Sequence, residues 1–381
     1  MKQGWEYKKL GEVCHITMGQ SPDGNSINDN EGVEFHQGKT CFGEQTLGVS
    51  NLFSNAPVKF AEAHSVLLCV RAPVGYPNIT DRKICIGRGL CALYAKEDID
   101  NKFLFYSLLS KQSHFEKNAT GSTFKAISSK VVSNTEIPIP PKSTQLAIVS
   151  ELDKINELIR IKKEQLKDYD NLAQSIFYEM FGDPVENDKG FDTKRLDEVF
   201  PLITDGTHQT PTYTEDRENG YKFLSAKDVT SGSINWNNVK FIPAWLHDNL
   251  SKRLKPQKND ILLCKNGTTG ICALVEDDDT FDIYVSLALL RPNNLHNPKY
   301  LTYAINSPAT KRQFDDSLKG IGVPNLHLKE IRRTIIIIPP LPLQQLFAQR
   351  IEQIEHQKSE VTKAITDLET LLASRMQYWF E

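Results

Sequence analysis

The feature that most constrains this chain is an internal repeat, because two segments 199 residues apart share one pattern. Residues 140–155 read PPKSTQLAIVSELDKI, and residues 339–354 read PPLPLQQLFAQRIEQI. Gln145 aligns with Gln344, and the offset is 344 − 145 = 199. This spacing exceeds the roughly 20 to 50 residues of a solenoid unit, so it indicates a duplicated module. Two tandem copies can present similar surfaces related by a pseudo-twofold axis, which suits a roughly twofold ligand such as duplex DNA.

The repeat reaches the other end of each copy. GWEYKKLGEV at 4–13 matches GFDTKRLDEV at 190–199 with an offset of 196 − 10 = 186, so the second copy gains 199 − 186 = 13 residues in its interior. Between these ends, VLLCVRAPVG at 66–75 and DILLCKNGTTG at 260–270 are apolar runs bounded by turn residues, which is typical of strands. The matched residues keep their order while the segments between them differ. This pattern indicates one scaffold with divergent loops that recognise two different things.

Each copy closes with the same succession of elements. A short helical pattern at 103–110 or 300–306 precedes an apolar strand that stops at Pro-Pro, and a long helical pattern follows. We therefore predict a mixed α/β fold, in which a long antiparallel two-helix coiled coil separates two tandem α/β domains. The predicted boundaries are 1–141 for the first domain, 142–182 for the central helix, 183–340 for the second domain, and 341–381 for the C-terminal helix that pairs with the central one.

Two long helices, at about 144–181 and 344–380, carry apolar residues in alternating steps of four and three. Such spacing over about five heptads is typical of a coiled-coil seam. Lys162 and Lys358 each interrupt the spacing once. The matched register favours packing of the helices on each other over helices that only cover their own domain or join a homodimer. The predicted seam residues are Ile148, Leu152, Ile155, Ile159, Leu166, Tyr169, Phe347, Ile351, Ile354, Val361, Ile365 and Leu368.

The composition is that of a soluble two-domain protein. A chain of 381 residues is long enough for two cores, and 39% hydrophobic with 24% charged residues is ordinary for globular domains. The longest apolar run, 335–341, contains two prolines and is shorter than the roughly 18 residues of a membrane helix. The N-terminus lacks the apolar stretch of a signal peptide, so we expect a cytoplasmic protein. The net charge of −3 counts mildly against a nucleic-acid ligand, although a basic face can coexist with acidic helices.

The sequence predicts neither a metal site nor a catalytic centre. Its seven cysteines include no CxxC pair, and Cys69 and Cys264 lie in apolar runs, where a thiol behaves as a small hydrophobe. No Asn/Asp-Pro-Pro-Tyr/Phe motif of a DNA methyltransferase and no GxxxxGK[ST] phosphate loop is found. Asp192-Thr193-Lys194 resembles half of a nuclease motif. Its counterpart in the first copy is Glu6-Tyr7-Lys8, however, which indicates a repeated structural strand.

Recognition of DNA needs cations for phosphates and amide or guanidinium groups for base edges. Both copies offer such residues in or near predicted loops, and His208 lies in a polar loop that suits DNA contact as well as a simple turn. We expect about half of these candidates to touch DNA, mostly at phosphates. The candidates are Lys39, Arg71, Arg82, Lys83, Arg88, Lys125 and Lys130 in the first copy, and His208, Lys227, Lys265, Asn266, Lys319, Asn325, Lys329, Arg332 and Arg333 in the second.

Several segments together resemble the specificity (S) subunit of type I restriction–modification systems. They are GWEYKKLGEV at the start, GSTFKAIS at 121–128, LAQSIFYEMFGD at 172–183, ITDGTHQTPTY at 203–213, FLSAKDVTSG at 223–232, and the Pro-Pro and Gln pattern that begins both long helices. Each motif is weak alone, but their order, spacing and duplication are specific, and the resemblance covers essentially the whole chain.

The resemblance implies a non-catalytic subunit that recognises double-stranded DNA. Each target recognition domain would read one half of a bipartite asymmetric site, and the helices would set the gap and dock two methyltransferase (modification) subunits. Restriction/translocase subunits would complete the complex, with S-adenosylmethionine, ATP and Mg bound by the partner subunits and no cofactor bound by this chain. The base-reading residues of the family vary with the target, so none is carried over.

Three alternatives remain open from the sequence. The chain could serve a fused methyltransferase–nuclease of the type IIB-like kind, which cuts on both sides of a bipartite site. It could also be a coiled-coil adaptor that binds protein at both domains, as the near-neutral charge permits. A free-standing enzyme is disfavoured because no nucleophile, metal site or phosphate loop is found.

Overall fold

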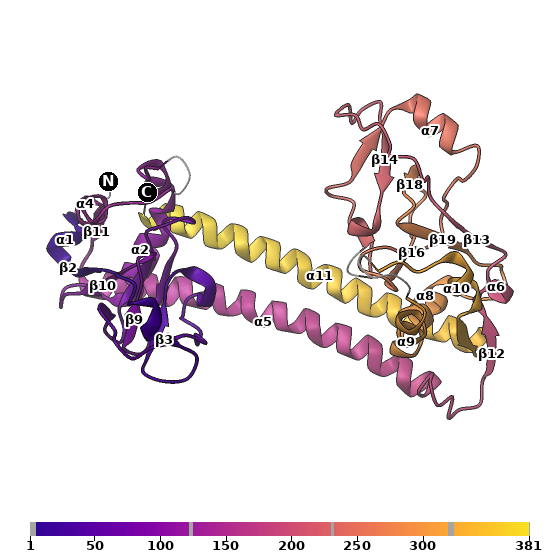
Figure 1. Cartoon of the computed structure of the whole chain (residues 1–381), viewed down its shortest axis with the longest axis horizontal. Helices are drawn as coiled ribbons and strands as arrows, with labels where there is room; N and C mark the ends of the chain where they lie inside the picture. The colour runs from indigo at the N-terminus through magenta and orange to yellow at the C-terminus, as the bar shows by residue number, and fades with distance from the viewer. Residues whose placement is uncertain (1–4, 122–124, 230–231, 319–323, 381) are drawn as a thin grey trace. The chain divides into compact units, whose positions relative to one another are not determined.

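The computed structural model describes residues 5–121, 125–229, 232–318 and 324–380. The chain forms two compact units, and each contains one copy of the repeat. Unit 1 comprises Met1–Glu164 with Val361–Glu381, and unit 2 comprises Gln165–Glu360. Both units mix helices and strands, as the sequence predicts (Figure 1).

Unit 1 contains a four-stranded antiparallel sheet between helices and a second sheet. Its strand order is β2-β10-β7-β8, and β1 pairs separately with β11. The second sheet has the order β3-β5-β4-β9-β6, in which β4 and β9 are parallel. The strands are β1 (Glu6–Lys9), β2 (Cys14–Met18), β3 (Ile27–Asn28), β4 (Val33–His36), β5 (Phe53–Ser54), β6 (Phe60–Ala61), β7 (Val66–Cys69), β8 (Pro77–Ile79), β9 (Ile84–Ile86), β10 (Leu90–Ala95) and β11 (Glu136–Ile139). The helices are α1 (Leu10–Val13), α2 (Asn101–Ser110), α3 (Gln112–Lys117) and α4 (Ser129–Asn134), with 3₁₀ turns η1 (Gly24–Ser26) and η2 (Lys39–Cys41).

Unit 2 repeats this plan. Its four-stranded sheet has the matching order β13-β19-β16-β17, β12 pairs with β20, and β14 lies parallel to β18 in the sheet β15-β14-β18. The strands are β12 (Asp192–Arg195), β13 (Leu202–Asp205), β14 (Tyr221–Leu224), β15 (Lys240–Ile242), β16 (Ile261–Cys264), β17 (Cys272–Leu274), β18 (Phe281–Ile283), β19 (Leu287–Arg291) and β20 (Ile335–Ile338). The helices are α6 (Leu196–Val199), α7 (Ala244–Leu250), α8 (Pro298–Asn306), α9 (Pro308–Asp316) and α10 (Leu328–Arg333), with the 3₁₀ turn η3 (Ala226–Val229).

Both four-stranded sheets are buried on two faces, which explains the unbroken apolar runs at their centres. In unit 1, Leu68 packs toward the helices, whereas Leu67 and Cys69 pack toward the second sheet. In unit 2, Leu263 and Leu262 divide in the same way. All seven cysteines are free, and burial raises the pKa of the Cys69 thiol to about 12, as expected for a small core hydrophobe.

A buried glutamine fixes the start of each long helix. The Gln145 Oε1 accepts a hydrogen bond from the Asp100 amide at 2.9 Å, and its Nε2 donates to the Pro140 carbonyl at 2.9 Å. Gln344 makes the matching bonds to the Asn297 amide at 2.9 Å and to the first proline of its own Pro-Pro pair at 2.7 Å. Asp100 and Asn297 cap α2 and α8, so each glutamine joins a long helix to the cap of a short one.

The long helices are α5 (Lys142–Phe181) and α11 (Leu341–Phe380). They begin at Lys142 and Leu341, two and three residues before the ranges over which the apolar spacing runs, and α11 accommodates Pro342 because proline is tolerated in the first helical turn. In the described part of the chain, no helix has the length and apolarity that a membrane crossing requires.

Each unit contains one segment of α5 and one of α11, paired antiparallel. In unit 1, Glu151 accepts hydrogen bonds from Arg375 and Trp379, and Lys163 lies 3.1 Å from Glu369. In unit 2, the Lys358 ammonium lies 2.5 Å from Asp170, and the Phe177 and Phe347 ring centroids are 5.7 Å apart.

The predicted seam positions are buried or half-buried, and those nearest the helix ends also belong to the unit cores. Ile148 and Leu152 join the core of unit 1, and Phe347, Ile351 and Ile354 join that of unit 2. The buried positions are Ile148, Leu152, Ile155, Ile159, Phe347, Ile351, Ile354, Val361 and Ile365, and the half-buried ones are Leu166, Tyr169 and Leu368. A continuous coiled coil stays a prediction.

Candidate nucleic-acid interface

Five loops meet at one end of the four-stranded sheet in unit 1, where β2 and β7 end and β10 begins. We call them the unit 1 loop cluster: residues 19–21, 37–39, 70–72, 87–89 and 125–127. Unit 2 has a matching unit 2 loop cluster: residues 206–208, 225–227, 265–267, 284–286 and 324–326.

Backbone hydrogen bonds of the same pattern join the loops in both clusters. Six bonds, all between 2.7 and 3.3 Å, recur at the aligned positions. In each bond the amide of the first residue donates to the carbonyl of the second, and each bond of unit 1 is followed by its counterpart in unit 2: Gly19–Leu90 and Gly206–Leu287; Gln20–Ile86 and Thr207–Ile283; Gly87–His36 and Tyr284–Leu224; Val70–Gly89 and Lys265–Ser286; Ala72–Lys125 and Gly267–Pro324; Ile127–Val70 and Leu326–Lys265. The loops therefore have a shared backbone framework, while their side chains differ.

One glycine in each cluster permits this close approach. A Cβ on Gly19 would lie 2.1 Å from the Gly87 carbonyl oxygen, and a Cβ on Gly206 would lie 2.0 Å from the Ile283 carbonyl oxygen. No side chain fits at such distances, because carbon and oxygen atoms repel strongly well before that separation. The two glycines are thus required for the loops to pack.

The unit 1 loop cluster is basic. Lys39, Arg71, Arg88 and Lys125 are all exposed on its loops. Among the described residues, none of the four lies within ion-pair distance of a carboxylate; Lys39 lies over the Tyr76 ring, 3.8 Å from its centroid. Four cations without a carboxylate partner at one end of a sheet can neutralise phosphates of a polyanion.

The unit 2 loop cluster is polar but largely charge-balanced. The Lys265 ammonium is buried and lies 2.7 Å from the Asp205 carboxylate, whose other neighbour is the exposed His208 at 3.3 Å. Burial by itself would raise the pKa of Asp205, but the hydrogen bonds and charges of Lys265 and His208 together lower that pKa below its ordinary value. The aligned positions in unit 1 are the apolar Met18 and Val70. The second unit therefore replaces an apolar pair with an ion pair.

Amides replace cations at the outer position of this second cluster. Asn266 pairs with Asn325 in an isolated antiparallel bridge, where unit 1 pairs Arg71 with Ala126. Lys227 is exposed, with its ammonium 3.8 Å from Asp228. Planar amides suit base edges, whereas cations suit phosphates. The two clusters thus offer different chemistry on one framework.

The remaining predicted residues lie outside the two clusters. Lys130, Lys329 and Arg333 are exposed on short helices, and Lys83 pairs with Glu62 at 2.8 Å. Arg332 donates to the Ile203 carbonyl at 2.6 Å. Lys319 lies outside the described residues.

Two predicted contact residues use their charged groups inside the fold. Arg82 is bonded to Glu34 and to loop carbonyls, and Lys265 is bonded to Asp205. Neither group is available to a phosphate, because its charge is already bonded to a carboxylate within the fold.

The sequence reasoning missed Gln20 and Gln37, whose exposed amides lie in the unit 1 loop cluster. Extending the repeat alignment to the strand ends would have pointed to Gln20, since it aligns with Thr207 beside the predicted His208. Within residues 5–121, 125–229, 232–318 and 324–380, no three His, Cys, Asp or Glu side chains form a group that could hold a metal ion.

The sequence matches the family model for the type I restriction modification DNA specificity domain over residues 2–168 and 188–370. The chain belongs to this family. Each matched range takes in one loop cluster, so the two clusters lie in two specificity domains of one chain.

Individual relatives agree with the assignment to the specificity-domain family. A type I restriction enzyme specificity subunit named MjaX, from Methanocaldococcus jannaschii, is 39% identical over 178 residues, which is 46% of this chain and 42% of that protein. The EcoBI specificity subunit of Escherichia coli is 23% identical over 74% of this chain and 65% of its own length. The chain thus spans less than two thirds of both relatives.

A solved structure shares the fold of this specificity-domain protein. The S subunit of a type I restriction–modification system from M. genitalium aligns over 100% of this chain and 98% of its own, with a TM-score of 0.57 and 17% identity. At that identity the likeness concerns the fold alone.

Proposed function

We propose that this chain is the non-catalytic DNA-recognition subunit of a type I restriction–modification complex. Each specificity domain reads one half of a bipartite, asymmetric DNA site. The loop clusters of units 1 and 2 contact the DNA, with exposed cations on phosphates and with amides and guanidinium groups on base edges.

The observation that carries this proposal is the pair of loop clusters on one backbone framework. A common framework supports two domains that approach DNA in the same manner. Their different side chains, with Arg71 in one domain and Asn266 at the aligned position in the other, support recognition of two different half-sites. This difference between the two domains supports an asymmetric target.

We further propose that α5 and α11 set the length of the gap between the half-sites and dock two methyltransferase subunits. The antiparallel pairing of the two helices within each unit supports this role. The partner subunits would bind S-adenosylmethionine and methylate adenine in both half-sites. Restriction/translocase subunits, with ATP and Mg, would complete a nuclease that protects its host in the cytoplasm.

The decisive experiment is methylation mapping of the whole genome in source cells with and without this gene. Loss of one gapped, two-part motif on deletion is the expected result, and it would reveal both half-sites. An unchanged methylation pattern in cells that express the protein would contradict the proposal and favour a protein-binding adaptor.

A further inference from the structure

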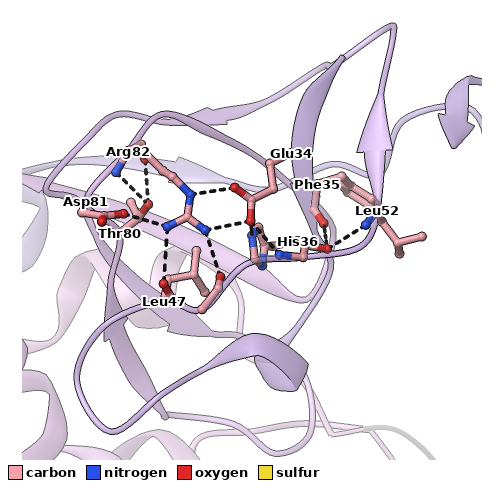
Figure 2. A network of polar contacts seen from close by, with 10 residues as sticks. Glu34, Phe35, His36, Leu47, Leu52, Thr80, Asp81 and Arg82 are labelled. Atoms are coloured by element: carbon pink, nitrogen blue, oxygen red, sulfur yellow. Dashed lines mark hydrogen bonds and ion pairs between the residues drawn. The ribbon is translucent and has the colours of Figure 1, made fainter. Parts of the chain in front are cut away.

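An ion pair in unit 1 joins Glu34 of β4 to Arg82, which lies just before β9 (Figure 2). The Arg82 guanidinium donates through Nε to Glu34 at 2.6 Å and through Nη2 to the other carboxylate oxygen at 2.8 Å. It also donates to the carbonyls of Leu47 at 3.4 Å and Gly48 at 2.9 Å, and to Asp81 at 2.7 Å. The guanidinium thus joins the start of β9, strand β4 and the loop that follows β4.

The carboxylate of this pair is held from further sides. Glu34 also accepts a hydrogen bond from the Ser50 amide at 2.7 Å and lies 2.8 Å from the buried His36 ring. Burial by itself would raise the pKa of Glu34, but the hydrogen bonds from Arg82, the Ser50 amide and His36 lower it to about 2. Burial lowers the pKa of His36, against the opposing effect of Glu34. Glu34 therefore holds the Ser50 end of the segment 47–50, and its partner Arg82 holds the other end at Leu47 and Gly48.

Unit 2 has an ion pair at the aligned positions with its charges reversed. Lys222 occupies the place of Glu34 and Asp279 that of Arg82, since 222 − 34 = 188 and 279 − 82 = 197 match the registers of β4 with β14 and β9 with β18. The Lys222 ammonium lies 2.8 Å from the Asp279 carboxylate. Both repeats thus join these two strands' segments by an ion pair, but the positions of the acidic and the basic residue are exchanged.

In each unit, the cation of the pair also holds the loop that leads away from β4 or β14. In unit 1, Arg82 holds Gly48, whose amide donates to the Cys41 carbonyl at 2.8 Å. Cys41 ends η2, the 3₁₀ turn that carries Lys39.

In unit 2, Lys222 lies over the Trp236 ring, 4.8 Å from its centroid. The adjacent Asn235 amide donates to the Asp228 carbonyl at 2.8 Å. Asp228 belongs to η3, the 3₁₀ turn that carries Lys227. In both units, therefore, the cation of the ion pair contacts a loop, and that loop is hydrogen-bonded to the turn that carries an exposed lysine. The cation contacts a backbone carbonyl of the loop in unit 1 and an aromatic ring of the loop in unit 2.

We propose that Glu34–Arg82 and Lys222–Asp279 are positioning pairs, each of which fixes the cation-bearing turn of its own loop cluster and so controls how one unit reads its half-site. The proposal rests on the proposed function. In this proposal Arg82 does not contact DNA itself; it holds the loop 37–52, which carries Lys39.

The first test measures amide hydrogen exchange in the full chain. In Glu34→Gln and Arg82→Gln, we expect exchange at the Phe42 and Gly48 amides to rise at least about tenfold, because local opening of the loop becomes easier. Lys83→Gln, which removes the neighbouring exposed cation, should leave these amides as in the wild type. Unchanged exchange in both Glu34 and Arg82 variants would overturn the positioning role.

The second test maps methylated motifs in cells that express the full chain with its partner subunits. We expect Glu34→Gln and Arg82→Gln to relax the same half of the motif, and Lys222→Gln and Asp279→Asn to relax the other half. The half that stays intact shows in each case that the chain is folded.

The outcomes separate the two proposals. If only Arg82→Gln relaxed a half-site and Glu34→Gln did not, Arg82 would contact DNA itself and the positioning role would fall. Faster exchange with both half-sites unchanged would also overturn it. If the wild-type chain produced no gapped motif, the proposed function would fail instead, and the exchange result alone would decide whether the pair holds the loop.

Discussion

The indole rings of Trp5 and Trp379 stack in unit 1, with their centroids 6.2 Å apart and their planes 3° from parallel. Trp379 also donates to Glu151 on α5 at 2.9 Å, and the next residue, Phe380, is buried in the unit 1 core. The last turn of α11 is therefore part of the first domain, although more than 200 residues of chain lie between them.

Trp379→Ala should destabilise unit 1 by about 2 kcal/mol, roughly half the cost of removing a fully buried aromatic ring, because Trp379 is half-buried. Chemical unfolding followed by hydrogen exchange in β1 and β11 would measure the loss. The matched control is Trp245→Ala, which removes a tryptophan that is 63% exposed in unit 2. That control should change stability by less than about 0.5 kcal/mol. Equal losses of stability in Trp379→Ala and Trp245→Ala would contradict the conclusion that the last turn of α11 is part of the first domain.

Gln145→Leu should cost about 3 kcal/mol or more. The change leaves the Asp100 amide and the Asp98 and Pro140 carbonyls without their buried partner, and each lost bond costs about 1 to 3 kcal/mol. Gln344→Leu should act alike in unit 2, whereas Gln345→Leu, at an exposed neighbouring site, should be nearly neutral. Urea unfolding of the three variants would measure these costs. A mild Gln145 variant would show that the glutamine bridge is dispensable.

The Glu34 pair should make stability depend on pH in the acidic range. The folded carboxyl has a pKa of about 2, below its ordinary value of about 4.3. Its contribution is therefore complete above about pH 4.3 and disappears as the pH falls toward 2. We expect the stability difference between wild type and Glu34→Gln to be constant from neutral pH down to about 5 and to shrink below about 4.3. Urea unfolding at several pH values tests this. A difference that grew on acidification would have the wrong sign.

Arg71→Gln should weaken binding to any duplex and reduce the salt dependence of affinity by about 0.9 in the log–log slope, if it contacts one phosphate. Asn266→Ala, at the aligned position in unit 2, should leave that slope unchanged, since an amide releases no counterion. Titration of a mixed-sequence duplex at several salt concentrations measures both. Lys363→Gln, at an exposed site on α11, controls for net charge. An equal decrease of the log–log slope in Lys363→Gln would mean that the salt dependence of DNA affinity reflects only the net charge of the protein.

Removal of seven residues from the middle of both α5 and α11 should shorten the gap in the recognised motif and leave both half-sites intact. Seven helical residues span about 10 Å, which corresponds to about three base pairs. Methylation mapping reads the gap directly. Removal of seven residues from α5 alone, which breaks the pairing register, should abolish the motif. A gap unchanged by the double deletion would show that the helices do not set it.

The sequence by itself determined the duplication, the strands in the clearest apolar runs and the two long helices. These features depend on local patterns: the Pro-Pro pairs that begin at Pro140 and Pro339 end strands because two successive residues lack the amide that a strand ladder needs, and the four-three spacing specifies a helix face. Residue type and position in predicted loops also marked Arg71 and Asn266 as candidate contacts.

Tertiary structure alone decided which polar residues come together. The bonds from Gly19 to Leu90 and from Val70 to Gly89, like the pair Glu34–Arg82, join residues that lie between 89 − 70 = 19 and 90 − 19 = 71 positions apart, and no local pattern encodes such pairing. Burial likewise decided that Arg82 and Lys265 hold loops in place while Lys39 and Arg71 stay exposed. A charged side chain looks the same in a sequence whether it faces water or a carboxylate, and only packing of distant strands distinguishes the two.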